Sequence, residues 1–318
     1  MRGIAVALVG ALGLACGSAA AAQAGAEDLL LRMSAAMRAL NYQGSFIYEH
    51  DGRTDALRVF HLGGPHERER LISLTGPRSE IVRNGNTITC IQAGGQPTIF
   101  TNAVSPMLVP LVPDAKAGAL DANYAVSLGG EDRIAGYNAQ IVEVAARDGY
   151  RYGYRLWLDQ ASRLLLRSVV IDARRRPLEQ FMFVALEVGS KPSETDLLPG
   201  NTGGKARTPA DEVALTGAPR WRVTDLPAGF VLARSQRPVH GPAGAEHLIY
   251  SDGLASVSVY IEPRGNKPAD ADAALSRGAL NVYSRSGDGW HITALGDVPA
   301  PTVERLARSV SPVIAPPD

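Results

Sequence analysis

The stretch "NYQGSFIYEHDGRTDALRVFHL", from Asn41 to Leu62, has the pattern of a β-hairpin. Two alternating runs, Gln43–Glu49 and Thr54–Leu62, flank a turn that contains Asp-Gly, a strong hairpin signal. Because side chains alternate across a strand, the hairpin has two different faces. One face carries Tyr42, Gly44, Phe46 and Tyr48, and the other carries Gln43, Ser45, Ile47 and Glu49. The aromatic face must pack either against the protein's own core or against a ligand that is bound and released.

Strand-like segments continue from this hairpin to about residue 188, separated by turn signals that contain glycine. This spacing favours an antiparallel meander in one large sheet. In "GYRYGYRLWLD", residues 149–159, Tyr154 and the leucines share one face, whereas Arg155 and Trp157 share the other. Both faces of the late strands are substantially apolar. A strongly curved sheet with one covered face would bury them and could enclose a ligand cavity.

Two other segments belong to this first region. In "AEDLLLRMSAAMRALN", residues 26–41, Leu30, Met33, Met37 and Leu40 recur at helical spacing and predict an amphipathic helix. The segment "AVSPMLVPLVPDAKAGALD", residues 103–121, contains three prolines, which exclude an ordinary strand or a long helix. Because it is apolar, we expect it to pack as a flap over the sheet.

Residues 190–220 lose all periodicity and are rich in Pro, Gly, Ser and Thr, which indicates a linker. Alternating strand and turn patterns resume beyond it. Helices are predicted at Asp270–Leu280 and at Thr302–Val310, so the second domain is expected to be α+β. The predicted organisation is a signal segment at 1–24, a first domain at 25–198, a linker at 199–217 and a second domain at 218–318.

The N-terminus has the pattern of an export signal, with Arg2, an apolar run over 4–14 and small residues before position 25. We therefore expect a soluble exported protein. Cys16 lies in "GLAC", which loosely resembles a lipoprotein signal, so lipid anchoring through Cys16 is the alternative. If Cys16 is removed with the signal segment, Cys90 is the remaining cysteine, and its strand-like neighbours predict a buried thiol.

Charge is balanced overall, with 32 basic and 32 acidic residues, which gives no whole-chain reason to expect nucleic acid as a partner. Residues 145–176, however, contain eight arginines and three aspartates. This basic cluster either protects a solvated sheet edge or binds an acidic peptide or an anionic lipid head group. The arginines in question include Arg147, Arg151, Arg155 and Arg167.

The chain contains no nucleophile elbow, phosphate-binding loop or dinucleotide fingerprint. Its six histidines lack metal-ligand spacing, and "HERER" at residues 66–70 lacks the second histidine of a zinc motif. His61 and His291 are more simply strand residues. We therefore expect no metal, no cofactor and no enzymatic activity. Dispersed residues of an exported hydrolase remain a separate hypothesis, because sequence cannot show which carboxylates converge.

Two long blocks of sequence carry a family resemblance. "YQGSFIYEHDG", "LRVFHL" and "HERERLISLTGPRSEIVRNGNTITC" resemble the N-terminal domain of the MucB/RseB family. "LIYSDGLASVSVYIEP" and "GALNVYSRSGDGWHITALGDVPAPTVERLARSV" resemble its C-terminal domain, in the same order. The resemblance implies a mainly β, α+β protein. Its first domain would be a half-closed antiparallel β-barrel of the LolA/LolB type, covered by helices, and its second domain would be smaller and α+β.

The resemblance also implies a periplasmic regulator of the envelope-stress sigma factor. Such a protein binds the periplasmic part of a membrane-spanning anti-sigma factor and shields it from regulated proteolysis. Lipid or lipopolysaccharide fragments release it, and self-association is left open. The alternative function is a periplasmic lipoprotein or lipid carrier, which would use the same first-domain fold.

If the protein is such a regulator, two groups of residues are candidates for its binding sites. Each aromatic side chain could instead simply pack in the protein's own core. The candidates for a lipid cavity in the first domain are Tyr42, Phe46, Tyr48, Tyr154 and Trp157. The candidates near the partner surface of the second domain are Tyr250, Asp252, Ser256 and Tyr260.

Overall fold

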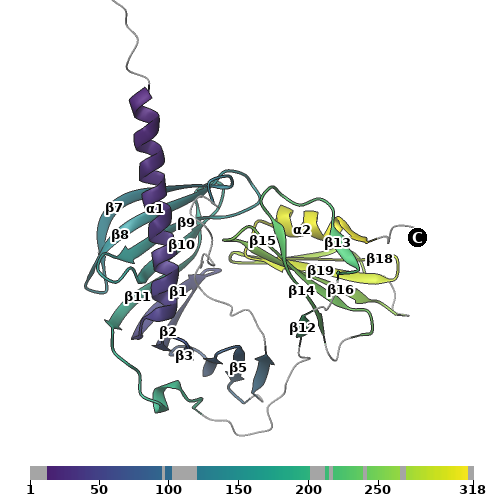
Figure 1. The fold of residues 1–318 in the computed structure, drawn as a ribbon. Coiled ribbons are helices and arrows are strands. Elements are labelled where there is room, and N and C mark those ends of the chain that lie inside the picture. Colours follow the sequence, from purple (N-terminus) through teal and green to yellow (C-terminus); the bar gives the residue numbers. More distant parts are fainter. Residues whose placement is uncertain are drawn as a thin grey trace, which may run out of the picture.

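The computed structural model describes residues 13–94, 97–101, 120–200, 212–214, 218–238, 242–265 and 270–313. Residues 13–22, 100, 101, 212–214 and 238 are described by their backbone only. Most of the proline-rich segment and residues 201–211 of the predicted linker lie outside the described residues. Two β-rich domains stand side by side in the molecule, with a long helix across the first (Figure 1).

Helix α1, Gly13–Ala39, precedes the first sheet. It crosses one face of that sheet, and its first turns project away from the body of the protein (Figure 1). Leu30, Met33 and Met37 are buried in the core, which confirms the predicted amphipathic stretch. In the described part of the chain, no helix combines the length and hydropathy needed to cross a bilayer.

The first domain is one open, antiparallel sheet. In spatial order its strands run β6-β5-β4-β3-β2-β1-β11-β10-β9-β8-β7, so β6 and β7 form its two edges and the sheet is not closed. The mainly β, half-closed architecture is thereby confirmed. Its strands are β1 Tyr42–His50, β2 Arg53–Leu62, β3 Arg68–Ser73, β4 Ser79–Asn84, β5 Thr87–Gln92, β6 Thr98–Thr101, β7 Tyr124–Ile134, β8 Tyr137–Ala146, β9 Gly153–Asp159, β10 Leu165–Ile171 and β11 Pro177–Val188.

The predicted hairpin is strands β1 and β2. They pair antiparallel from Tyr42 opposite His61 to His50 opposite Arg53. Asp51 (φ 51°) and Gly52 (φ 70°) form the two-residue loop with both φ values positive, as a type I′ turn requires. The other side of β1 pairs with β11, so the hairpin lies in the middle of the sheet rather than at its edge.

The second domain is a seven-stranded sheet in the order β12-β14-β15-β16-β19-β18-β17, with helix α2, Ala300–Arg308, packed on one face. A short sheet of β13 Trp221–Val223 and β20 Val310–Pro312 closes its end. The one-turn 3-10 helix η1, Thr195–Leu197, follows the first sheet. The strands are β12 Glu212–Ala214, β14 Val231–Pro238, β15 Glu246–Ser251, β16 Ser256–Pro263, β17 Ala273–Arg277, β18 Leu280–Gly287 and β19 Trp290–Gly296.

Of the two predicted helices, the second is confirmed and the first is wrong. Helix α2 buries Val303, Leu306 and Ala307, as the spacing predicted. The Asp270–Leu280 segment instead forms β17 and the start of β18. Gly278 (φ 58°) begins the two-residue loop that joins them. Pairing with β18 thus overrides the modest helix propensity of the alanines.

Candidate functional site at the domain interface

The aromatic face of the hairpin packs within the first domain. Phe46 is buried, and its ring centroid lies 4.8 Å from Phe181 and 5.8 Å from Phe183, in edge-to-face contacts. Phe181 and Phe183 are themselves 5.0 Å apart. These three rings form an aromatic cluster at the centre of the sheet. In this structure Phe46 is therefore a core residue, which is the simpler of the two interpretations of its alternating pattern.

Tyr42 lies at the end of the aromatic face that adjoins α1. Its ring stacks on buried His61 at 4.5 Å. His61 Nδ1 lies 2.8 Å from the carbonyl oxygen of Leu40, and Nε2 lies 3.0 Å from Glu67 Oε1. Both partner atoms are oxygens, so the His61 ring makes a pair of polar contacts, one through each nitrogen. This pair ties the end of α1 to β2.

Glu67 is held ionised by its donors. Burial opposes ionisation of this carboxyl, but hydrogen bonds from His61 and from Arg83, at 2.7 Å, outweigh it and lower the pKa of Glu67 from 4.5 to about 2. Arg83 also lies 3.8 Å from Glu69. The C-terminal end of α1 thus lies over a compact network of polar and charged side chains, and not over an apolar surface.

The five cavity candidates do not share one face. Leu156 is opposite Ser168, and Ser168 is opposite Phe181, so Leu156 lies on the face of the aromatic cluster. Tyr154 is two residues from Leu156 in the same strand and therefore lies on that face too. Trp157 lies on the opposite face. There the Arg167 guanidinium covers its ring at 4.3 Å, and its indole N–H donates to Asp132 Oδ2 at 2.9 Å. The structure therefore separates Trp157 from Tyr42, Phe46, Tyr48 and Tyr154.

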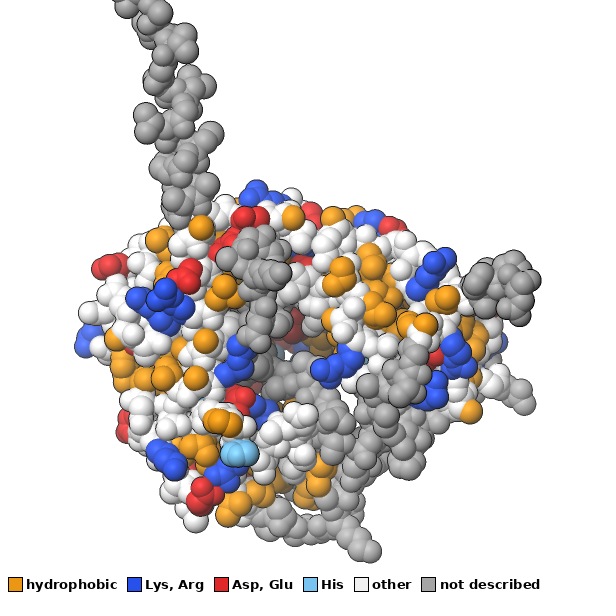
Figure 2. Space-filling model, in the orientation of Figure 1, with side chains coloured by type: hydrophobic (Ala, Val, Ile, Leu, Met, Phe, Trp, Pro, Cys, Tyr) orange, Lys and Arg blue, Asp and Glu red, His pale blue; other side chains and the backbone are white. Residues whose placement is uncertain are grey.

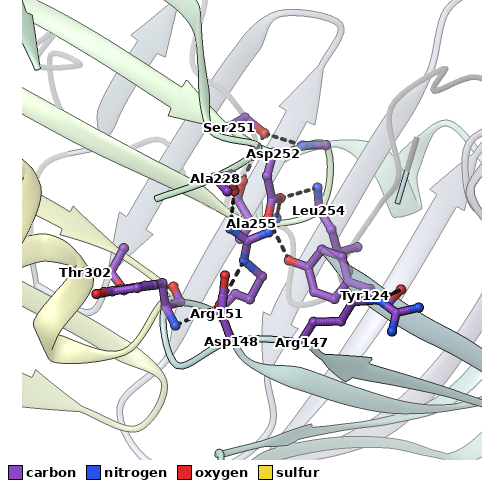
Figure 3. A network of polar contacts seen from close by, with 12 residues as sticks. Tyr124, Arg147, Asp148, Arg151, Ala228, Ser251, Asp252, Leu254, Ala255 and Thr302 are labelled. Atoms are coloured by element: carbon purple, nitrogen blue, oxygen red, sulfur yellow. Dashed lines mark hydrogen bonds and ion pairs between the residues drawn. The ribbon is translucent and has the colours of Figure 1, made fainter. Parts of the chain in front are cut away.

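A buried ion pair joins the two domains. Arg151, in the loop between β8 and β9, places Nη1 3.1 Å from Oδ2 of Asp252 in the β15–β16 turn, and both side chains are fully buried. The same oxygen accepts the hydroxyl of Tyr124 at 2.9 Å (Figure 3). Oδ1 accepts the backbone N–H groups of Leu254 and Ala255 at 2.9 and 2.7 Å. We call Tyr124, Arg151 and Asp252 the interdomain lock.

The surroundings of the lock remove it from water. The Arg151 guanidinium lies over the rings of Tyr124 at 5.5 Å and Phe230 at 5.1 Å, and its Nη2 donates to the Ala228 carbonyl at 2.6 Å. Burial, followed by the negative charge of Asp252, raises the pKa of Tyr124, so its hydroxyl stays a donor. Removing one member of a buried pair leaves an uncompensated charge. The lock therefore favours one arrangement of the two domains strongly over any that opens it.

Two further contacts flank the lock. On one side, the Thr302 hydroxyl of α2 donates to the Tyr150 carbonyl at 2.7 Å, and Arg305 lies over the Tyr150 ring at 4.8 Å. On the other side, Asn281 Nδ2 donates to the hydroxyl of Tyr152 at 3.0 Å. Residues 150–152 of the first domain thus contact helix α2, strand β18, the β15–β16 turn and the loop at residues 228–230 of the second domain.

Glu179 links the aromatic face to the second domain. Its Oε2 accepts the Tyr48 hydroxyl at 2.6 Å, and its Oε1 accepts the backbone N–H of Ala279 in the β17–β18 loop at 2.7 Å. Burial, reinforced by Glu179, raises the pKa of Tyr48 and keeps the hydroxyl protonated. One carboxylate therefore bridges a cavity candidate of the first domain to a hairpin of the second domain.

The partner-surface candidates lie in different environments. Tyr250 is buried in the second core, and its hydroxyl accepts the Val223 N–H at 2.9 Å. Asp252 is part of the lock. Tyr260 stacks on His247 with centroids 4.0 Å apart, and Ser256 is exposed at the start of β16. The structure does not bring these four side chains together in one surface.

The arginine cluster is similarly dispersed. Arg147 donates to the carbonyl oxygens of Asp121 and Tyr124, and Arg155 pairs with Glu143 at 2.6 Å. Arg151 is buried in the lock, and Arg167 is stacked on Trp157. On the face shown in Figure 2, basic side chains do lie at the rim of a hollow between the two domains. The first domain contributes some of these cations, but the four named arginines each have their own local partners.

The functional residues that sequence reasoning missed are Tyr124 and Glu179. Tyr124 starts β7 within "DANYAV", and Glu179 lies near the start of β11. Neither belongs to a motif or breaks a periodicity, so no signal in the sequence singled them out. Among the described residues, no group of three or more His, Cys, Asp or Glu side chains is placed to hold a metal ion.

Comparison with known families covers both domains. The model of the MucB/RseB N-terminal domain matches residues 25–201, and that of the MucB/RseB C-terminal domain matches residues 216–311. The sigma factor AlgU regulatory protein MucB of Pseudomonas aeruginosa is 34% identical over 304 residues, which are 92% of each chain. The sigma-E factor regulatory protein RseB of Escherichia coli K12 is 31% identical over 288 residues, 89% of each chain.

Solved structures give the same relationship in three dimensions. A complex of Pseudomonas aeruginosa MucA and MucB contains a chain with a TM-score of 0.70 and 33% identity, covering 92% of the present chain and 100% of that one. MucB bound to MucA(peri) gives a TM-score of 0.69 at 33% identity, with 91% and 100% coverage. The similarity thus extends over both sheets.

Proposed function

Because the chain belongs to the MucB/RseB family, we propose that it is a negative regulator of an envelope-stress sigma factor. It binds the periplasmic part of a membrane-spanning anti-sigma factor and shields that segment from regulated proteolysis. Lipid or lipopolysaccharide-like signals trigger its release. The protein acts by binding, without a cofactor and without catalysing a reaction.

The observation that carries this proposal is the end-to-end similarity to MucB, including MucB crystallised with MucA. The names of the relatives describe regulatory proteins, which supports binding rather than catalysis. The export pattern of residues 1–24 supports a periplasmic location, with anchoring through Cys16 as the alternative.

Regulation by a lipid requires two coupled sites. A ligand shifts an equilibrium only if it binds one domain arrangement better than the other. The aromatic face around Phe46 and Tyr48 is the first site, and the second domain with its interface is the other. The lock holds the observed arrangement, and the hydrogen bonds of Glu179 connect the Tyr48 hydroxyl to that interface. A lipid that displaces Tyr48 therefore disturbs a contact that both domains share.

The partner surface lies on the second domain and along the interface. Ser256 and Tyr260 are the candidates in β16 that touch the partner directly. Asp252 acts through the lock, since its side chain is fully buried against the first domain. Tyr250 supports the β13 strand from within the core. The basic side chains around the hollow in Figure 2 supply positive charge for an acidic peptide or an anionic head group.

The decisive experiment is binding of the anti-sigma factor's periplasmic segment to the purified full-length mature chain by calorimetry. A tight one-site isotherm is expected, together with slower cleavage of the segment by the site-1 protease. Adding lipopolysaccharide fragments should weaken both effects. No heat of binding and no protection would refute the proposal.

The alternative function is transport of lipoproteins or lipids, which the aromatic sheet face beneath α1 favours. A carrier needs no second domain locked onto the first, and this is why regulation is preferred. Co-purification of an acylated lipoprotein, with transfer to an acceptor protein and no affinity for the anti-sigma segment, would establish the carrier instead.

A further inference from the structure

The edge strands of the two sheets differ in how they are protected. Natural sheets guard an edge with charge, proline, bulges or short length, because unpaired backbone groups attract another strand. Edge strand β7 carries Glu131, Asp132 and Arg133 and has a bulge between Leu128 and Glu131. β6 has four residues and β12 has three.

Strand β17 is less protected, since its one charged side chain is Arg277 at the end beside the loop. It is the last strand of the second sheet among the described residues, and its pairing with β18 runs without a register shift. All five of its residues, Ala273–Arg277, are exposed, and no lysine or proline interrupts them. Leu275, at its centre, is 65% exposed, which is the largest value among the large hydrophobic side chains described.

Within the described part of the chain, the backbone of β17 has groups without a strand partner at two positions. In a hairpin closed by a two-residue loop, the residues that flank the loop exchange hydrogen bonds, and the pattern alternates along the strand. Arg277, Leu275 and Ala273 therefore point their N–H and C=O groups toward β18. Ala274 and Ser276 point theirs away from the sheet, where a further strand would pair with them.

An apolar row continues from this edge across the sheet. Leu275 is opposite Val282, and Val282 is opposite Leu295, so the three side chains share one face. Tyr283 and Ala294, on the other face, are buried in the core with α2. The row therefore lies on the face that α2 leaves uncovered, and Val282 and Leu295 are only half-buried.

The same hairpin is held by the first domain. The Ala279 N–H at its tip donates to Glu179, and Asn281 at the start of β18 donates to Tyr152. A strand added to β17 thus lies beside the domain interface. Its affinity depends on whether the first domain keeps the hairpin in place.

From the bare edge, the apolar row and the anchored tip, we propose that β17 binds an extended segment of the anti-sigma partner as an added β-strand. This inference rests on the proposed function and assigns its binding surface. Main-chain hydrogen bonds to Ala274 and Ser276 supply the register, and alternate apolar side chains of the segment pack on Leu275 and Val282.

A second copy of this chain is a less suitable occupant. Pairing of two five-residue strands buries far less than the roughly 1,200–2,000 Å² of a stable interface. A flexible partner segment can continue from the edge onto the apolar row and the neighbouring interface, and so bury more surface than a rigid second copy.

The test measures binding of the fluorescently labelled periplasmic segment to the full-length mature chain. Ala274→Pro removes one outward N–H at an edge position that tolerates proline, and Leu275→Lys removes the central apolar contact. Each should weaken binding by about tenfold or more. The matched control is Val231→Lys in β14, because Val231 is 63% exposed, almost the same as Leu275. It should change the affinity by no more than about twofold.

Hydrogen exchange on the wild-type complex gives a second readout that needs no variant. The amides of Ala274 and Ser276 should become protected when the segment binds. If the segment binds the wild type but both variants bind equally well and these amides stay unprotected, the β17 assignment is wrong and the proposed function stands. If the wild type does not bind the segment, the proposed function fails, and the assignment with it. If the variants change only the sedimentation of the free protein, β17 is a self-association edge, which also overturns the proposal.

Discussion

The aromatic cluster and the interdomain lock are both buried, but they are built from opposite chemistry. The cluster consists of Phe46 and its two phenylalanine neighbours, held by apolar burial and edge-to-face contacts. The lock consists of one cation, one carboxylate and one hydroxyl, all removed from water. Apolar packing is non-directional and can rearrange around a new occupant, whereas an ion pair depends on its full set of partners.

Under the proposed function, this difference gives the two regions different parts in lipid-triggered release. A lipid can enter an aromatic region by exchanging one apolar contact for another, at little net cost. The lock cannot yield gradually, because a half-broken buried pair leaves a charge without a partner. It therefore favours two discrete arrangements, closed and open. A sensor needs both properties, an adaptable site and a two-state element that it biases.

The largest effect is expected from Asp252→Ala. This change removes the buried partner of the Arg151 guanidinium, which keeps only the partly exposed Asp148 at 3.4 Å, and it also removes the acceptor of the Tyr124 hydroxyl. Losing one partner of a buried ion pair costs about 3–5 kcal/mol. Urea unfolding should show that loss, and small-angle scattering should show a more extended molecule because the domains separate.

The matched control is Asp225→Ala, which removes an aspartate–arginine pair near the same interface. Asp225 pairs with Arg305, but its side chain is 58% exposed. Surface pairs of this kind contribute little, so both readouts should stay near those of the wild type. Equal losses in the two variants would show that burial is not what makes the lock important.

Phe46→Ala tests the aromatic cluster. It should destabilise the first domain by about 3 kcal/mol, the lower part of the range for such truncations, because Phe181 and Phe183 can partly close the gap. The scattering profile under native conditions should not change, since the interface is untouched. Lipid binding measured on the folded variant then decides whether Phe46 also contacts the ligand. Unchanged lipid affinity would leave it with a purely structural role.

The sequence predicted the aromatic face of the hairpin and not the lock, for a physical reason. Alternation of apolar residues reports which side chains face a core, and it located Tyr42, Phe46 and Tyr48 on one face together with the correct hairpin turn. It also places Trp157 on the face opposite Tyr154, although both are candidates for the lipid cavity. A polar contact between distant segments leaves no such periodicity, so Arg151 was seen only as one of eight clustered arginines.

Two other differences have the same origin. The Asp270–Leu280 stretch looks helical because alanine favours helices, and only pairing with β18 makes it a strand. Tyr250 and Asp252 lie in a block of family resemblance, which identifies a segment as important but does not distinguish core from surface. Both are buried, and Asp252 faces the other domain.

A smaller, pH-dependent effect is expected at the end of the aromatic face, where Glu67 binds His61. The pKa of Glu67 is about 2 in the folded protein and 4.5 in the unfolded chain. The ionised carboxylate therefore stabilises the folded state fully above pH 4.5. This stabilisation is lost as pH falls from 4.5 to 2. The Tm difference between wild type and Glu67→Gln should therefore be constant above pH 4.5 and shrink below it. A Tm difference that stays constant below pH 4.5 would show that the ionised Glu67 carboxylate does not stabilise the fold.

The smallest effect is expected from Tyr48→Phe, which tests whether the two regions are connected. The change keeps the ring and removes only the hydroxyl that donates to Glu179 at 2.6 Å. Loss of a hydrogen bond to a charged group costs about 1.5–3 kcal/mol, and the half-buried position of Tyr48 favours the lower end. Because Glu179 then loses one of its two constraints, the Ala279 amide should exchange faster with solvent. Tyr137→Phe removes a hydroxyl that donates to the Leu186 carbonyl within the first domain, so it should leave Ala279 exchange unchanged. Equal protection of Ala279 in both variants would mean that the aromatic face and the domain interface act independently.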